Sequence, residues 1–182
     1  HRRKVFALTA PVKMYLEYYN KVNPTEYRQT LELDNAFAYS SADDTIIYNP
    51  NARGFDETDF DFVAVHETAH RADLLNIRSH ENKRFRESIS RAMKNVQQNL
   101  PLYQKIAKWS DSEAFQDILN ALSDGALPTK YGHSKEYWTA NDNNRSLEIF
   151  AELFVLEAQN RPELKIVKAA WPELWEAYEA LF

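Results

Sequence analysis

The chain has 182 residues, of which 44% are hydrophobic and 27% are charged. These values are typical of a soluble globular protein of about one domain that buries a core. The formal net charge of -5 gives no reason to expect nucleic acid as a partner. Charged residues interrupt every apolar stretch well before the ~18–20 residues that span a bilayer, so no membrane partner is expected. The lack of cysteine excludes disulfides, thiolate metal sites and cysteine nucleophiles.

The residue pattern in the first half of the chain predicts one helix and a β-hairpin. Aromatic and apolar residues at helical spacing predict a helix over about 10–19, before the stop at Asn23-Pro24. A short extended segment around 36–39 and a strand at 45–48 flank a polar turn, and together they predict a β-hairpin.

The second half is predicted to be helical. A strong helix begins near Thr58 or Asp59 and ends near Asn76. Further helices are expected at 81–99, 111–122, 146–158 and 172–182, with a long polar loop over 123–145. This order predicts an α+β fold: a mostly helical domain with a small antiparallel or mixed sheet.

The sequence His66-Glu67-Thr68-Ala69-His70 matches the pattern H-E-x-x-H on the strong helix. Residues four apart on a helix point in similar directions, so both imidazoles can reach one metal ion. Two neutral ring nitrogens suit zinc. Glu67 lies in the neighbouring sector, where a carboxylate can accept a proton from zinc-activated water. The alternative is a chance match on a solvated helix, but the apolar run Phe62–Val65 before the motif argues against an exposed surface helix.

A third zinc ligand must come from another part of the chain, because catalytic zinc usually has three protein donors. Glu148 and Glu152 lie one turn apart in an otherwise apolar helix, where buried acids need a cationic partner. Either carboxylate can be the ligand with the other accepting a hydrogen bond beside it, and a third reading has both facing water.

Three stretches resemble a known family. H-E-x-x-H-x-x-D from His66 to Asp73 and E-x-F-A-E from Glu148 to Glu152 resemble the anthrax lethal factor-like zincins. The stretch Tyr131–Trp138 resembles the peptidase-like domain of some phage minor head proteins and their toxin-like relatives. The resemblance covers roughly 37–182. It implies a zincin-like catalytic domain at 36–182, preceded by an N-terminal helical segment of the same domain at 1–35.

The resemblance also implies roles for single residues. His66, His70 and Glu148 become the ligands of Zn²⁺, and Glu67 becomes the general base. Asp73 becomes a supporting or structural acid. Lethal factor-like enzymes place a tyrosine that stabilises the oxyanion seven residues before the glutamate ligand, but Asn141 stands there in this sequence.

Other residues can supply that oxyanion donor. Tyr137 lies eleven residues before Glu148, and His133 or Tyr131 are alternatives, because any donor close to the developing charge can serve. Tyr137 can equally be a packing residue of the loop. The strand at 45–48 fits the exposed edge strand with which a zincin pairs its extended peptide substrate.

These residues favour a zinc-dependent endopeptidase that acts on a protein or peptide substrate. The alternative is a catalytically weak or inactive zincin-fold module that serves as a structural or partner-binding part of a phage or toxin protein. A zinc hydrolase of small amides would use the same metal residues. The chain does not begin with Met, so we expect a fragment of a longer protein, and its compartment and oligomeric state stay open.

Overall fold

The computed structural model describes residues 5–7, 37–40, 44–48 and 60–182. The chain divides into two compact units, His1–Arg71 and Ala72–Phe182. The expected helix at 10–19, the helix cap at 58 or 59 and the expected boundary between 35 and 36 all lie outside the described residues.

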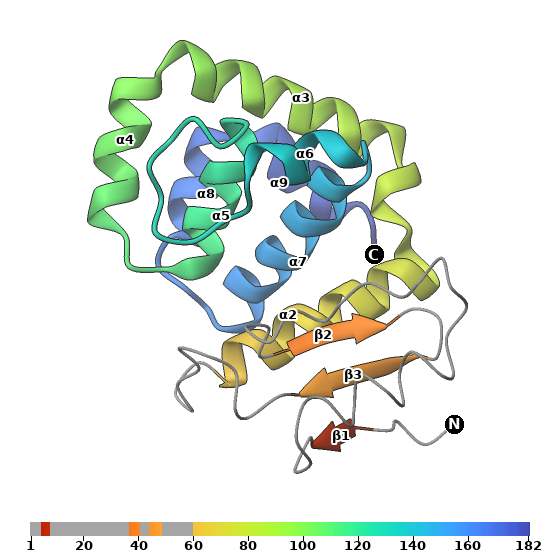
Figure 1. Cartoon of the computed structure of the whole chain (residues 1–182). Helices are drawn as coiled ribbons and strands as arrows, with labels where there is room; N and C mark the ends of the chain where they lie inside the picture. Colours follow the sequence, from red (N-terminus) through yellow and green to blue (C-terminus); the bar gives the residue numbers. More distant parts are fainter. Residues whose placement is uncertain (1–4, 8–36, 41–43, 49–59) are drawn as a thin grey trace. The chain divides into compact units, whose positions relative to one another are not determined.

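The described part of the first unit contains a three-stranded sheet and one helix. The strands are β1 (Val5–Ala7), β2 (Phe37–Ser40) and β3 (Thr45–Tyr48), in the order β1-β3-β2 (Figure 1). Strand β3 is parallel to β1 and antiparallel to β2. The prediction that β3 is an exposed edge strand is therefore wrong. Because both its edges already carry a partner strand, β3 cannot pair with an extended substrate.

Helix α2 (Phe60–Ala72) carries the H-E-x-x-H motif and is anchored near its C-terminal end. The guanidinium of Arg71 donates two hydrogen bonds to the carboxylate of Asp44, at 2.5 and 2.7 Å. Asp44 directly precedes β3 and has a positive φ of 51°. The hydrogen bond and charge of Asp44 raise the pKa of Arg71. This bidentate pair links the end of α2 to the turn that begins β3.

The second unit is built from helices alone. After two short turns, η3 (Asp73–Ile77) and η4 (Ser79–Glu81), it contains α3 (Lys83–Gln98), α4 (Leu100–Trp109), α5 (Glu113–Leu122), α6 (Lys135–Ala140), α7 (Asn144–Ala158), α8 (Leu164–Ala170) and α9 (Pro172–Glu179). Among the described residues, no helix combines the length and the apolar character needed to cross a bilayer.

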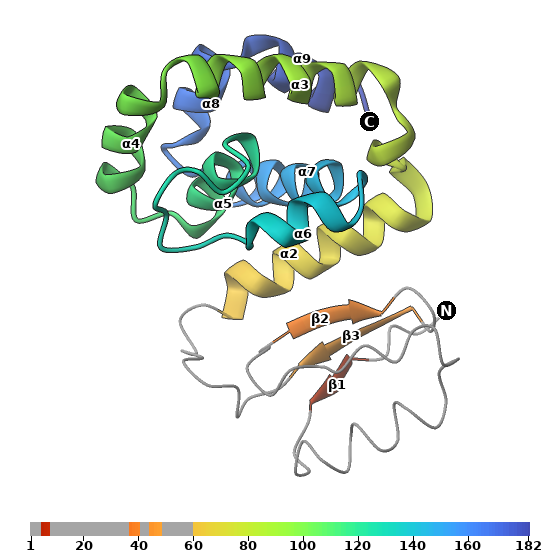
Figure 2. The ribbon, with the colours of Figure 1, turned by 45° about the horizontal axis from the view of Figure 1, so that its top comes forward.

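Helices α5 and α7 form the centre of this unit. Every residue of α5 from Ala114 to Leu122 is buried, and α7 buries a broad face that includes Ile149, Phe150 and Leu153. Helices α3, α8 and α9 lie on one side of this pair, and α6 lies on the other (Figure 2). The two central helices therefore position any polar side chain that they carry inside the core.

The prediction of an α+β fold is wrong. Each element of the described chain from Phe60 to Glu179 is helical, so the second unit is all-α. The three strands are three or four residues long and belong to the other unit. The sequence pattern detected strands correctly as local extended segments, but it could not show that the helices build their own core without a sheet.

Three helices were missed. Helix α4 directly follows the predicted helix at 81–99, and Pro101 lies in its first turn, where proline is favoured because its missing N–H has no partner to lose. Helix α8 also lies in a stretch that carried no prediction. Helix α6 lies inside the predicted loop at 123–145, where the hydroxyl of Ser134 accepts the N–H of Tyr137 at 3.4 Å and caps the helix.

Asp73 lies at the start of the helical unit, directly after the motif helix. Its side chain is fully buried, and its two carboxylate oxygens accept the backbone N–H and the hydroxyl of Ser79, both at 2.6 Å. The Ser79 hydroxyl also lies 3.4 Å from the carbonyl oxygen of Ser146 on α7. The π-type turn η3 begins at Asp73, and the N–H of Arg78 closes it on the Asp73 carbonyl at 2.7 Å. Asp73 is therefore a structural residue.

Asp73→Asn should destabilise the protein, because an amide nitrogen would replace one of the two acceptors that Ser79 uses. Hydrogen bonds to a buried charged group contribute about 1.5–3 kcal/mol each, so we expect a loss of this order in the free energy of unfolding. Urea unfolding followed by circular dichroism measures it. Asp142→Asn, at an exposed acid, is the matched control and should change little. Equal stability of the two variants would contradict the structural role of Asp73.

Candidate metal centre

His66 and His70 lie on one face of α2, as the spacing predicts. Their Nε2 atoms are 2.9 Å apart, and their rings meet edge to face with centroids 4.5 Å apart. Two imidazole nitrogens bound to the same tetrahedral zinc ion are about 3.4 Å apart, given Zn–N bonds of about 2.0–2.1 Å. A small increase in the distance between the two nitrogens would therefore allow both to bind one ion.

Other residues of this helix pack beside the two histidines. Phe62, one turn before His66, stacks against its ring with centroids 6.2 Å apart. Ala69 is fully buried, and the hydroxyl of Thr68 donates to the carbonyl of Ala64 at 2.7 Å. Glu67 is buried as well, with 9% of its surface exposed. Within the motif, Glu67 and Ala69 are buried, His66 and His70 are half-buried, and Thr68 is exposed.

The two acids of α7 are inside the protein. Glu148 is 6% exposed and Glu152 is 2% exposed, so the reading in which both face water is wrong. The hydroxyl of Tyr137 donates a hydrogen bond of 2.5 Å to Oε1 of Glu148. Tyr137 therefore reaches this carboxylate from α6, although Asn141 occupies the position that the family pattern gives to tyrosine.

His133 lies next to the same carboxylate. Its ring stacks on that of Tyr137, with centroids 3.9 Å apart and an angle of 18° between the planes. Its Nε2 lies 3.8 Å from Oε1 of Glu148 and 3.8 Å from Oδ2 of Asp117. The third alternative, Tyr131, instead bonds to the Lys130 ammonium through its hydroxyl at 2.9 Å.

Asp117 is a site residue that the sequence analysis missed. It lies on α5 and is 5% exposed. The signal was present, because Asp117 is an acid among the apolar residues Ala114, Phe115, Ile118 and Leu119, a pattern like the one that drew attention to Glu148. The polar residues of α5 were overlooked because they match no metal-binding motif.

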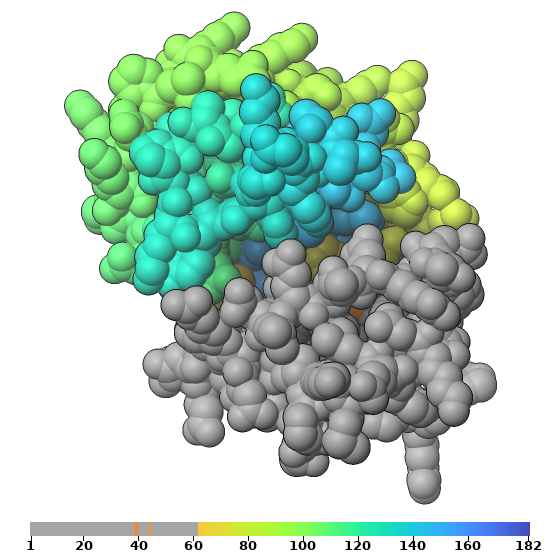
Figure 3. All heavy atoms as spheres, in the orientation of Figure 1, coloured from red at the N-terminus to blue at the C-terminus, as the bar shows by residue number. Residues whose placement is uncertain are grey.

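Two buried amides of α5 hold the segment before α6 in place. Oε1 of Gln116 accepts the backbone N–H of Lys130 at 2.7 Å. Oδ1 of Asn120 accepts the backbone N–H of His133 at 3.2 Å and the indole N–H of Trp138 at 2.8 Å. Because one amide oxygen holds both His133 before α6 and Trp138 within α6, His133 and Tyr137 lie together next to Glu148. This segment and α6 form part of the outer surface of the helical unit (Figure 3).

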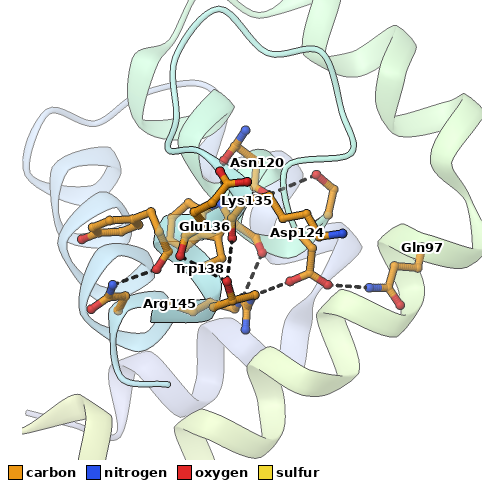
Figure 4. Close-up of polar contacts among 12 residues, drawn as sticks. Gln97, Asn120, Asp124, Lys135, Glu136, Trp138 and Arg145 are labelled. Carbon is orange, nitrogen blue, oxygen red and sulfur yellow. Dashed lines mark hydrogen bonds and ion pairs between the residues drawn. The ribbon is translucent and has the colours of Figure 1, made fainter. Parts of the chain in front are cut away.

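Arg145 holds the first turn of α7 against α5. Figure 4 shows Asp124 between Gln97 and Arg145, and it is paired with both. The Nε of Arg145 also donates to the carbonyl oxygen of Ala121, in the last turn of α5, at 3.0 Å. Since Glu148 lies three residues after Arg145, these contacts help to fix its position.

No family model, curated protein or solved structure matches this chain. The resemblance to the lethal factor-like zincins therefore rests on the motif residues themselves.

Gly132 is required where the segment before α6 crosses α5. Its φ is +127°, and a Cβ added there would lie 2.5 Å from Cγ of Asn120. Gly125 also has a positive φ, of +73°, but its added Cβ would meet nothing closer than 3.7 Å. Gly132→Ala should therefore lower the free energy of unfolding by more than Gly125→Ala, by about 1–3 kcal/mol.

Urea unfolding of both variants tests this difference, because the control shares the positive φ and lacks the close contact. Equal losses in the two variants would mean that the approach of Gly132 to Asn120 does not hold the segment.

Proposed function

We propose that the protein is a zinc-dependent endopeptidase in which His66 and His70 of α2 and Glu148 of α7 bind the ion. The observation that carries this proposal is the pair of imidazole nitrogens 2.9 Å apart on α2, next to the buried Glu67. Two convergent imidazoles with an adjacent carboxylate form a donor set suited to zinc and to water activation.

Glu148 is the proposed third ligand. Its carboxylate is buried, at 6% exposed, and accepts a hydrogen bond from the hydroxyl of Tyr137. One carboxylate would complete a donor set of two imidazoles and one oxygen, which suits a catalytic zinc ion.

The proposed chemistry divides between the ion and the protein. A bound zinc ion polarises a carbonyl group and makes water acidic enough to lose a proton near neutral pH. Glu67 accepts that proton while the water oxygen bonds to the scissile carbonyl carbon. When the C–N bond breaks, Glu67 passes the proton to the leaving nitrogen, so that an amine and a carboxylic acid are released, and the acid then loses its proton to solvent.

Tyr137 is the proposed donor to the oxyanion. Its hydroxyl already lies 2.5 Å from the Glu148 carboxylate, and its ring is fixed by stacking on His133. A hydroxyl held beside a metal ligand needs only a small rotation to reach an oxygen of the substrate. In the ground state the same hydrogen bond orients the carboxylate of Glu148, as hydrogen bonds to metal ligands commonly do.

The second candidate function is a zincin-fold module that binds a partner without catalysis. The absence of a tyrosine at Asn141 favours it, since the family pattern for the oxyanion donor is broken there. Strand β3 also has no free edge for a substrate. Tight zinc binding without cleavage of any member of a broad peptide library would support this function.

Metal binding by single-site variants tests the ligand set. After removal of metal by EDTA, the first equivalent of zinc should bind much more weakly to Glu148→Gln than to the unchanged protein. Glu152→Gln is the matched control, one turn along the same buried helix face, and should retain tight binding. Isothermal titration measures both affinities. Tight binding by Glu148→Gln together with loss in Glu152→Gln would assign the ligand to the other acid.

Peptide cleavage by Glu67→Gln tests the catalytic mechanism. The amide keeps the size of the side chain but cannot accept the proton, so zinc binding should persist while cleavage falls by about 10²–10⁴-fold. EDTA-sensitive cleavage of a peptide library, identified by mass spectrometry, supplies the substrate. Glu87→Gln on α3 is the control for loss of one carboxylate. Cleavage at the unchanged rate by Glu67→Gln would contradict the mechanism.

A further inference from the structure

A second group of metal-ligating side chains lies entirely within the helical unit. It consists of Asp117 on α5, His133 before α6 and Glu148 on α7, whose ligand atoms all lie within 4.8 Å of one another. Only Glu148 is shared with the proposed zinc site. We propose that these three side chains bind a divalent transition-metal ion of their own.

The distances suit a common ion. Nε2 of His133 lies 3.8 Å from a carboxylate oxygen of Asp117 and 3.8 Å from one of Glu148. Both separations exceed hydrogen-bond length. Three atoms bound to one ion through bonds of about 2.1–2.2 Å lie about 3.5 Å apart at tetrahedral angles. A contraction of a few tenths of an ångström would bring the His133 nitrogen to this spacing from both carboxylates, and the two carboxylate oxygens lie within 4.8 Å of each other.

The charges also favour a cation. Asp117 and Glu148 are 5% and 6% exposed, and both face the same ring nitrogen. Two carboxylates that are close together and removed from water repel each other, and a divalent ion between them offsets this repulsion. Two oxygens and one imidazole nitrogen form a mixed donor set, which suits Mn²⁺ or Zn²⁺ better than Mg²⁺ or Ca²⁺.

Neighbouring residues fix the positions of the three side chains. Asn120, one turn after Asp117, accepts the backbone N–H of His133, and Tyr137 both stacks on the His133 ring and bonds to Glu148. Such contacts fix the orientation of metal ligands. The His133 side chain is 38% exposed, which gives an ion a route from solvent. Glu148 has two carboxylate oxygens and can serve both ions.

The test uses a protein that lacks the imidazoles of α2. In a His66→Ala/His70→Ala background, freed of metal by EDTA, we expect one Mn²⁺ to bind per chain, as measured by loss of the free Mn²⁺ signal in electron paramagnetic resonance. Adding Asp117→Asn should weaken this binding at least tenfold, whereas Asp111→Asn, at an exposed acid, should not. Absence of Mn²⁺ binding in the background, or equal binding after Asp117→Asn, would overturn the proposal.

A second variant guards against loss of folding. His133→Phe keeps a ring to stack on Tyr137 but removes the ligand nitrogen, so the protein should stay folded by circular dichroism. Electron spin-echo modulation from one imidazole nitrogen should appear with bound Mn²⁺ in the background and vanish in this variant. Modulation that persists would show that another group binds the ion. Because the background lacks His66 and His70, these results do not depend on whether the protein cleaves peptides.

Discussion

The described structure depends most on the two hydrogen bonds that the buried carboxylate of Asp73 accepts from Ser79. Asp73 lies directly after the motif helix, and it uses both oxygens on Ser79, which in turn contacts the backbone at the start of α7. Two residues earlier, the guanidinium of Arg71 donates two hydrogen bonds to the carboxylate of Asp44 before β3. Each of these two carboxylates therefore holds the chain at the end of the motif helix within its own unit. A metal site requires such support, because ligands that are held in place lose little freedom when an ion binds.

The helical unit contains a cluster of buried polar side chains within its apolar core. Helices α5 and α7 pack together along their apolar faces, and each carries one buried acid, Asp117 or Glu148, close to His133. Burying these acids is costly, and the buried amide of Asn120 adds a further polar group that must be satisfied. The side chain of Asn120 makes three of the described hydrogen bonds, to Thr129, His133 and Trp138, and these hold the segment that carries His133 and Tyr137. The polar interior is therefore arranged around Glu148.

The sequence predicted the parts of this arrangement that depend on local periodicity. Helices α3, α5 and α7 lie within a few residues of their expected positions, and the two histidines share a face because a helix turn requires it. Contacts between distant segments could not be predicted. Strand β1 pairs with β3 across about forty residues, and this pairing removes the free edge that local reasoning had given to β3. Asp117 escaped notice because its partner, His133, is sixteen residues away on a segment whose path depends on Gly132 and Asn120.

The central claim is that two imidazoles of one helix and one carboxylate of another bind a single zinc ion. Anomalous diffraction at the zinc edge, from crystals grown with the metal, locates the ion directly. The account predicts one strong peak about 2.0–2.2 Å from Nε2 of His66, from Nε2 of His70 and from a carboxylate oxygen of Glu148. A peak bound by the two imidazoles with Glu148 turned away, or no peak at these histidines, would contradict it.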